Sequence, residues 1–235
     1  MLMRKLAIAL VLLFALGSCL QANAGPGFKV KDVDEFLIFQ PCACIDMYYT
    51  DGGYYSQPQT DKAAGMVADI INMERFPFSE MVSADYYGDG ANADALKWAR
   101  ILVETKPRDV SRLRVPKSLI AKLNESEDRY GVFIYTYGYV TSVEAYEKEK
   151  RDKAVSRAVD AVAEELTGVK GLTNPTQNYT PDIPYNNEML CVVIDKQERS
   201  VVYYKKQKAP MFNSHPTDYE DVSKMLHKLL RDFIK

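Results

Sequence analysis

The segment from Gly131 to Ser142, GVFIYTYGYVTS, constrains the fold of this chain more than any other. Phe133, Tyr135 and Tyr137 recur at every second position, and Tyr139 continues the row. Side chains at alternate positions of a β-strand point to the same face of the sheet. The pattern therefore predicts a central strand whose aromatic row belongs to the core and is covered by a helix.

A hairpin follows late in the chain. Met189 to Asp195 (MLCVVID) is apolar enough for a buried strand, and Ser200 to Lys205 (SVVYYK) returns after the turn from Lys196 to Arg199. Two strands joined by so short a turn pair antiparallel. The sheet is therefore not purely parallel.

The rest of the chain alternates short strands with amphipathic helices. Strands are predicted over 36–40 and 78–84, and helices over 61–74, twice between 92 and 127, after Thr141, and after Thr217. Capping boxes, Thr141 with Glu144 and Thr217 with Glu220, open the last two helices. The order predicts an α/β fold: a mixed β-sheet of about five strands flanked by helices, a single domain over 25–235, closing with a β-hairpin and a C-terminal helix.

The N-terminus predicts export. Arg4 and Lys5 precede the apolar run from Leu6 to Leu16, which is too short to span a bilayer, since spanning takes about 20 residues. A charged start, a short apolar run and small residues after it mark a secretory signal peptide, here residues 1–24.

Two cleavage sites compete. Leu16-Gly17-Ser18-Cys19 resembles the lipobox of bacterial lipoproteins, and cleavage before Cys19 would leave a lipidated cysteine that anchors the protein to a membrane. We therefore expect a membrane-anchored lipoprotein facing the periplasm or the cell surface. Cleavage after Ala24 stays open, and it would give a soluble periplasmic or secreted protein.

The charge of the chain excludes one class of partner. The net charge is −2, and the basic residues are interspersed with acidic ones rather than gathered in a stripe. Nucleic-acid binding needs a basic surface. No nucleic-acid partner is expected.

Four stretches together resemble the family of small envelope lipoproteins that share the fold of the TolB amino-terminal domain and of CsgG-like assembly proteins. They are FLIFQP, DKAAGMVADIINM, GVFIYTYGYV and VVIDKQERSVVYY. The helices between 92 and 127 and the loop 168–188 depart from that pattern, as does the hairpin turn, which lacks the usual glycine. The resemblance implies a non-enzymatic part of an envelope assembly, with envelope proteins or further copies of itself as partners.

Apart from Cys19, which is either lipidated or removed, three cysteines remain: Cys42, Cys44 and Cys191. Cys-x-Cys matches neither the spacing of zinc sites nor the redox motif Cys-x-x-Cys. We favour the interpretation that these cysteines are small apolar residues packed near the sheet. A disulfide from Cys42 or Cys44 to Cys191 stays open, and no metal or other cofactor is expected.

Residues 41–59 are predicted to form a long connection, with its turn at Asp51-Gly52-Gly53. Tyr48, Tyr49, Tyr54 and Tyr55 flank that turn. Aromatic side chains on a long connection suit a binding surface. They support an alternative function, a glycan-binding or cell-wall-binding module.

No catalytic constellation emerges from the sequence. The two histidines, His215 and His227, lie near or on the last helix, and no Gly-x-Ser-x-Gly elbow is present. The favoured function is thus non-enzymatic, as one component of a protein assembly in the cell envelope.

Overall fold

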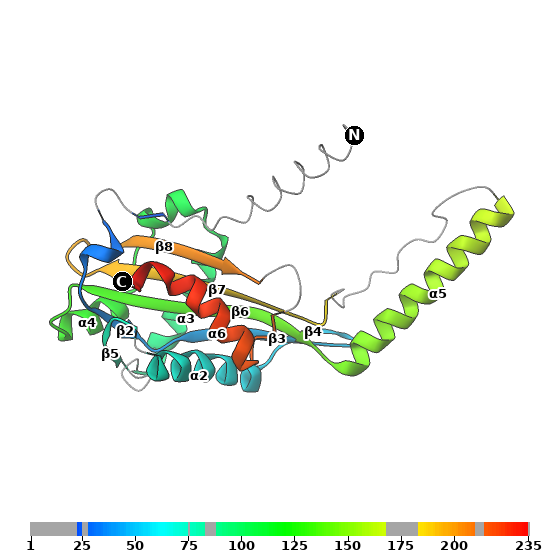
Figure 1. Ribbon diagram of the computed structural model, residues 1–235, viewed down its shortest axis with the longest axis horizontal. Coiled ribbons are helices and arrows are strands. Elements are labelled where there is room, and N and C mark those ends of the chain that lie inside the picture. Colours follow the sequence, from blue (N-terminus) through cyan, green and yellow to red (C-terminus); the bar gives the residue numbers. More distant parts are fainter. Residues whose placement is uncertain are drawn as a thin grey trace, which may run out of the picture.

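A computed structural model gives the arrangement of the chain (Figure 1). It describes residues 23–24, 28–74, 76–82, 88–167, 183–209 and 214–234. Most of the predicted signal peptide, including Cys19, lies outside these residues.

The described strands form one mixed sheet. They are β1 (Asn23–Ala24), β2 (Phe36–Phe39), β3 (Cys42–Tyr49), β4 (Gly52–Tyr55), β5 (Phe78–Val82), β6 (Tyr130–Thr141), β7 (Tyr185–Asp195) and β8 (Ser200–Lys208). The main order is β1-β8-β7-β6-β2-β5, with β3 also on β6 and β4 on β3. β6 is parallel to β2 and β3 and antiparallel to β7. This confirms the predicted fold class, including the central strand and the closing hairpin.

Helices cover both faces of the sheet (Figure 1). They are α2 (Gln57–Met73), α3 (Gly88–Glu104), α4 (Lys117–Glu125), α5 (Val143–Thr167) and α6 (Tyr219–Leu230), with short 3₁₀ helices η1 (Val30–Asp32), η3 (Pro107–Arg112) and η4 (Arg231–Phe233). α3, α4 and η3 pack on one side, which we call the α3 face. α2 and α6 pack on the other, the α2–α6 face.

Each face has its own core. On the α3 face the Trp98 ring packs on Phe133, with 5.6 Å between the ring centroids. On the α2–α6 face, α6 buries Leu226 and Leu229 completely, and both follow its apolar stripe. A buried Leu contributes about 1.5–3 kcal/mol relative to an exposed one, so the stripe of α6 fixes this helix firmly on the sheet.

β2 and β3 are two pieces of one run along β6, separated by a joint at Pro41. Ile38 pairs with Val132, and Cys42 pairs with Tyr135. Four steps along the β2–β3 run therefore match three along β6, so the joint holds one extra residue, as in a β-bulge. Consequently odd-numbered residues of β2 but even-numbered residues of β3 lie on the α3 face.

The long connection predicted over residues 41–59 is wrong. β3 and β4 form an antiparallel hairpin in which Tyr49 pairs with Gly52. The turn lies at Thr50-Asp51, and Gly52 takes the positive φ of 146° that glycine tolerates. The alternation of buried and half-buried residues in β3 shows why a strand forms there: one face packs on α2 and the other is partly open.

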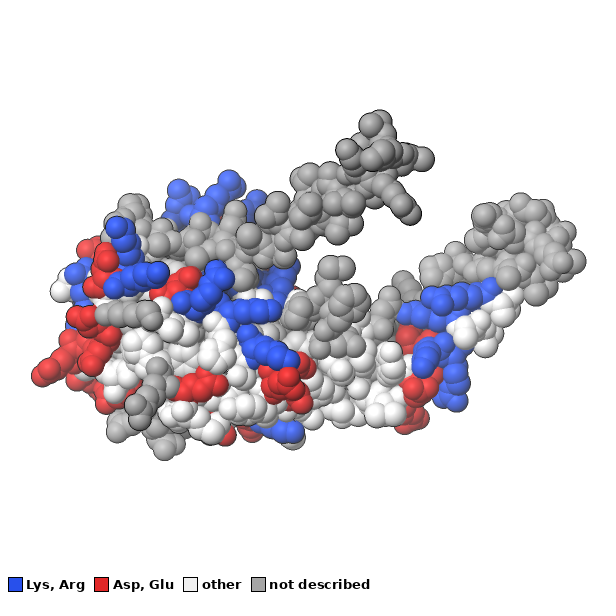
Figure 2. All heavy atoms as spheres, viewed as in Figure 1, with Lys and Arg blue, Asp and Glu red and all other residues white. Residues whose placement is uncertain are grey.

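α5 leaves the body of the molecule and extends away from the sheet (Figure 1). The predicted apolar stripe is present on it, but Val155 is 62% exposed and Val159 is 49% exposed. Lys and Arg alternate with Asp and Glu along the described side chains of this helix (Figure 2). The part of the stripe whose side chains are described, which ends at Val159, is therefore largely exposed.

Candidate functional site

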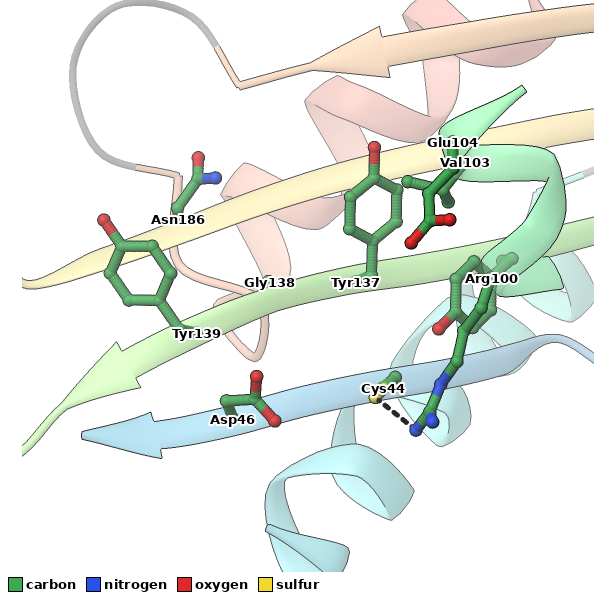
Figure 3. A pocket seen from close by; sticks show the side chains of 10 residues that line it. Cys44, Asp46, Arg100, Val103, Glu104, Tyr137, Gly138, Tyr139 and Asn186 are labelled. Carbon is green, nitrogen blue, oxygen red and sulfur yellow. Dashed lines mark hydrogen bonds between the residues drawn. The ribbon is translucent and has the colours of Figure 1, made fainter. Parts of the chain in front are cut away.

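An open groove of about 480 Å³ lies on the α3 face, beyond the end of the helix that covers the core there. We call it the tyrosine groove. Its lining comes from β3 (Cys44, Asp46), α3 (Arg100, Val103, Glu104), β6 (Tyr135, Tyr137, Gly138, Tyr139) and β7 (Asn186), as Figure 3 shows.

The groove exists because α3 is shorter than the strand it covers. α3 ends at Glu104, and it buries Phe133 and Tyr135 of β6. Tyr137 and Tyr139 lie further along the same face and are only half-buried. The prediction that the whole aromatic row is core is therefore right for the first half of the row and wrong for the second.

The inner end of the groove is polar. The Arg100 guanidinium donates from Nη2 to Cys44 Sγ at 3.4 Å (Figure 3). The Tyr135 ring stacks on Tyr137, with 5.7 Å between the ring centroids. Burial raises the pKa of the Tyr135 hydroxyl, and the neighbouring Cys44 thiol adds to the rise. Tyr135 is therefore a neutral phenol at physiological pH.

The Tyr137 side chain belongs to a satisfied network at the rim. Its hydroxyl donates to Glu188 Oε2 at 2.5 Å, and Lys206 Nζ lies 3.1 Å from the same carboxylate oxygen. The Lys206 ammonium also lies over the Tyr137 ring, 5.1 Å from the centroid. Burial raises the pKa of Tyr137, and the hydrogen bond to Glu188 adds to the rise.

Two carboxylates in the groove have no partner within the part of the chain that the structure describes. No hydrogen bond or ion pair engages Asp46 on β3 or Glu104 at the end of α3. Asn186 lies across the groove from Asp46, on the strand next to Tyr139 (Figure 3). The groove therefore offers free acceptors and an amide beside an aromatic surface.

The four tyrosines predicted as one loop surface are divided by the hairpin. Tyr48 and Tyr55 share a face with Asp46, whereas Tyr49 and Tyr54 point to the opposite face. Tyr49 and Tyr54 contact each other at 6.3 Å between ring centroids. They do not form one surface with Tyr48 and Tyr55, because neighbouring residues of a strand alternate between faces.

Sequence reasoning missed the part of the groove that Tyr139 forms. Of the four tyrosines predicted as a binding surface, none lines the groove, but the Tyr48 ring meets Tyr139 edge to face, with 5.4 Å between the centroids. Burial raises the pKa of Tyr139, and the nearby Tyr48 adds to the rise. A signal was present in the sequence, since Gly138 lies inside the strand and glycine in a strand often marks a close approach of backbone or ligand.

The three cysteines are free thiols, and the open possibility of a disulfide to Cys191 is not realised in this structure. Cys42 and Cys44 pack on the α3 face, whereas Cys191 is buried on the α2–α6 face. The sheet thus separates the sulfurs, and a bridge would have to pass through it. All three cysteines are small side chains packed against the sheet.

Neither histidine lies at the groove. His215 packs edge to face on Tyr185 at 4.9 Å between the rings, and burial lowers its pKa. His227 Nε2 lies 2.6 Å from Glu74 Oε2, beside Phe76. Both contacts are on the α2–α6 side of the molecule.

Within the described ranges, no three His, Cys, Asp or Glu side chains gather closely enough to hold a metal ion. No described helix combines the length and the apolar character that crossing a membrane requires.

No family model matches the chain, and no curated protein matches its sequence. Among solved structures, the chain is similar to PelC from Paraburkholderia phytofirmans, a dodecamer, with 11% identity and a TM-score of 0.37 over 91% of this chain and 95% of that one. A point variant of that PelC is also similar, with 11% identity and a TM-score of 0.38 over 93% of this chain and 100% of that one.

A protein of the DUF4136 family from Bacteroides thetaiotaomicron is similar as well, with 7% identity and a TM-score of 0.31 over 89% of this chain and 94% of that one. None of these three is a TolB or CsgG protein, so that resemblance stays a prediction.

Proposed function

We propose that this protein is an exported, non-enzymatic lipoprotein that works as one component of a protein assembly in the cell envelope. The observation that carries the proposal is α5, a helix of 25 residues that extends away from the domain. Helices of globular proteins gain most of their stability from packing an apolar face. A long helix with an exposed apolar stripe therefore suits contact with another protein chain.

The stripe has the spacing of a packing face. Val155 and Val159 are one helical turn apart and largely exposed, and the sequence continues the series with Val162 and Leu166. Apolar residues spaced alternately by four and three positions form the seam of paired helices. The charged residues around the stripe keep the helix in water when it is unpaired.

The anchoring half of the proposal rests on the sequence around Cys19. A lipidated cysteine at this position would leave the domain tethered close to a membrane, where assembly partners are concentrated. Replacement of Cys19 by Ala should move the exported chain from the membrane fraction to the soluble fraction. A chain that stays membrane-bound after this change contradicts a lipid anchor at Cys19.

Crosslinking in intact cells, followed by mass spectrometry of the captured complexes, tests the assembly role. The double variant Val155→Asp with Val159→Asp should lose the crosslinked complexes, because charged groups at the seam oppose helix pairing. The matched control is Ile101→Asp with Ile183→Asp, which changes side chains 44% and 42% exposed on the body of the molecule. If the unmodified protein is captured with no protein at all, or if the valine variant is captured normally, the proposal fails.

A further inference from the structure

We propose that the tyrosine groove binds a saccharide chain. The inference is independent of α5 and Cys19, because the groove lies on the α3 face of the sheet and is built from β3, β6, β7 and the end of α3. Its chemistry has three parts: an aromatic platform, unpaired hydrogen-bond acceptors, and a rigid backbone that holds both in place.

Tyr139 supplies the platform. Its ring is half-buried and is fixed from the side by the edge-to-face contact with Tyr48. The C–H-rich face of a sugar ring packs well on the negative face of an aromatic ring, and a tyrosine adds a hydroxyl at its tip. A sugar unit lying on Tyr139 would reach the polar groups on both sides of β6.

Asp46 and Glu104 supply the acceptors. A carboxylate accepts several hydrogen bonds, and neither of these two engages any other described residue. Asn186 adds both a donor and an acceptor on the other side of the platform. Sugar hydroxyls both donate and accept, so they match this mixed lining, and the volume lies within the range of sites for small ligands.

The groove is less suited to a cationic protein segment. One of its aromatic faces, that of Tyr137, already carries the Lys206 ammonium at 5.1 Å from the ring centroid. Arg100 lies within the groove as a second cation. A stretch of lysines or arginines would meet these two cations as well as the carboxylates of Asp46 and Glu104, whereas the uncharged hydroxyls of a sugar chain meet no like charge in the groove.

The groove is also preformed. Tyr139 pairs with Asp46 on one side and with Asn186 on the other, so the platform and two of its polar groups sit on three adjacent strands. Binding then costs little ordering of the protein. The same register means that the three side chains share one face of the sheet.

The test uses the full exported chain, purified in mild detergent, on a printed array of oligosaccharides from bacterial envelopes. Calorimetry then measures the affinity for the best-bound tetrasaccharide. Tyr139→Ala should weaken binding about tenfold or more because it removes the stacking face, and Asp46→Asn should do so because it replaces a charged acceptor with a weaker neutral one. Tyr139→Phe should keep most of the affinity, since it keeps the stacking face.

Tyr54→Ala is the matched control, because Tyr54 is 52% exposed on the same hairpin but on the opposite face. It should leave binding unchanged. Glu104→Gln replaces an exposed side chain with one of the same shape and keeps the test valid if Tyr139→Ala fails to fold. Binding to a neutral sugar should change little between low and high salt.

Three results would overturn the inference: no saccharide of the array is bound, a bound saccharide is unaffected by Asp46→Asn and Glu104→Gln, or a tetra-arginine peptide binds in preference to every sugar. The last result would assign the groove to a cationic protein partner, and it would show the strong salt dependence of a charged contact. Loss of the crosslinked assemblies in the α5 variant has no bearing on any of the three.

Discussion

The ring of Tyr48 meets the ring of Tyr139 edge to face, with 5.4 Å between the ring centroids. The two residues come from parallel strands, β3 and β6, whose pairing holds them on the same face of the sheet. This contact joins the hairpin of β3 and β4 to the central strand at the open end of the groove.

The contact should be measurable as a coupling energy. In a double-mutant cycle, Tyr48→Ala and Tyr139→Ala should couple by about 0.5–1.5 kcal/mol in the free energy of unfolding, the usual worth of an aromatic pair beyond its burial. Urea denaturation of the four proteins measures it. The pair Tyr48→Ala and Tyr54→Ala, on opposite faces, should be additive. A coupling near zero for the first pair would contradict the edge-to-face contact.

Gly138 allows β7 to lie close to β6. A Cβ atom at this position would lie 2.0 Å from the backbone oxygen of Asn186. Gly138→Ala should therefore destabilise the protein by about 1–3 kcal/mol, because backbone atoms must move to make room. Gly65→Ala is the matched control: a Cβ there meets nothing within 4 Å on α2, and alanine favours helix by about 1 kcal/mol. Equal effects of the two changes on thermal unfolding would contradict this account.

Periodicity predicted the larger part of the fold. The alternating pattern around Phe133 located β6, and the apolar stripe around Leu226 located α6. These signals are local, since each depends only on the spacing of apolar residues within one element. Parallel pairing of β3 with β6 is not local, and nothing near Cys42 in the sequence indicates it.

The wrong predictions of strand pairing and of helix caps each depend on a single residue. The strand predicted over 36–40 and the connection predicted over 41–59 meet at Pro41, but this proline marks a joint after which the pairing with β6 resumes one residue out of step. The helix caps were each displaced by one residue: Ser142 Oγ accepts from the Ala145 amide, and Asp218 Oδ1 accepts from the Asp221 amide. Ser and Asp cap as well as Thr does, so composition alone does not choose between neighbours.

The candidate site could be predicted only in part. Of the four tyrosines predicted as a surface, Tyr48 contacts the groove residue Tyr139, whereas Tyr49 and Tyr54 lie on the other face because residues alternate along β3 and β4. Tyr139 was assigned to the core because nothing in the sequence shows how far α3 extends over β6. The length of a covering helix is a tertiary property.

The turn between β7 and β8, which lacks the usual glycine, holds a residue in a strained backbone conformation. Arg199 has a φ of 51°, and it is the one residue other than glycine with positive φ in the described ranges. This conformation costs an L-residue about 1–2 kcal/mol. Arg199→Gly relieves this cost, but glycine loses more conformational freedom on folding than arginine does. The net result should be a rise of about 0.5–1 kcal/mol in the free energy of unfolding. Glu198→Gly, at negative φ in the same turn, should lower it, and a gain in both variants would contradict the assignment.

The three thiols should differ in reactivity. Burial raises the pKa of Cys42 to about 12, and burial also raises the pKa of Cys191. Since the thiolate is the reactive form, both should alkylate slowly at pH 8. Cys44 lines the groove and should react first. Brief treatment with iodoacetamide and peptide mass spectrometry measures the order, with the urea-unfolded chain as the control in which all three react. A disulfide to Cys191 would instead protect two thiols even after unfolding.

An ion pair between buried Lys205 and half-buried Asp232 links η4 to β8 and makes stability depend on pH. The Lys205 side chain is 2% exposed, and its ammonium donates to Asp232 Oδ2 at 2.9 Å, while the Tyr203 hydroxyl donates to the same oxygen at 2.7 Å. Burial pushes the pKa of Asp232 upward, but the hydrogen bonds from Lys205 and Tyr203 outweigh it and hold the pKa below its ordinary value.

Because the folded state lowers this pKa, the pair contributes its full stability above the ordinary Asp pKa of about 3.9 and loses it as the pH falls through the lower folded value. Asp232→Asn leaves a buried ammonium without its counter-charge and should cost about 3 kcal/mol at pH 7. The variant should also lose less stability than the parent protein between pH 5 and pH 2. Glu220→Gln, which breaks the exposed pair with Lys224, should change stability by less than about 0.5 kcal/mol. Thermal unfolding across this pH range measures both effects, and identical pH profiles for Asp232→Asn and the parent would show that the pair does not stabilise the fold.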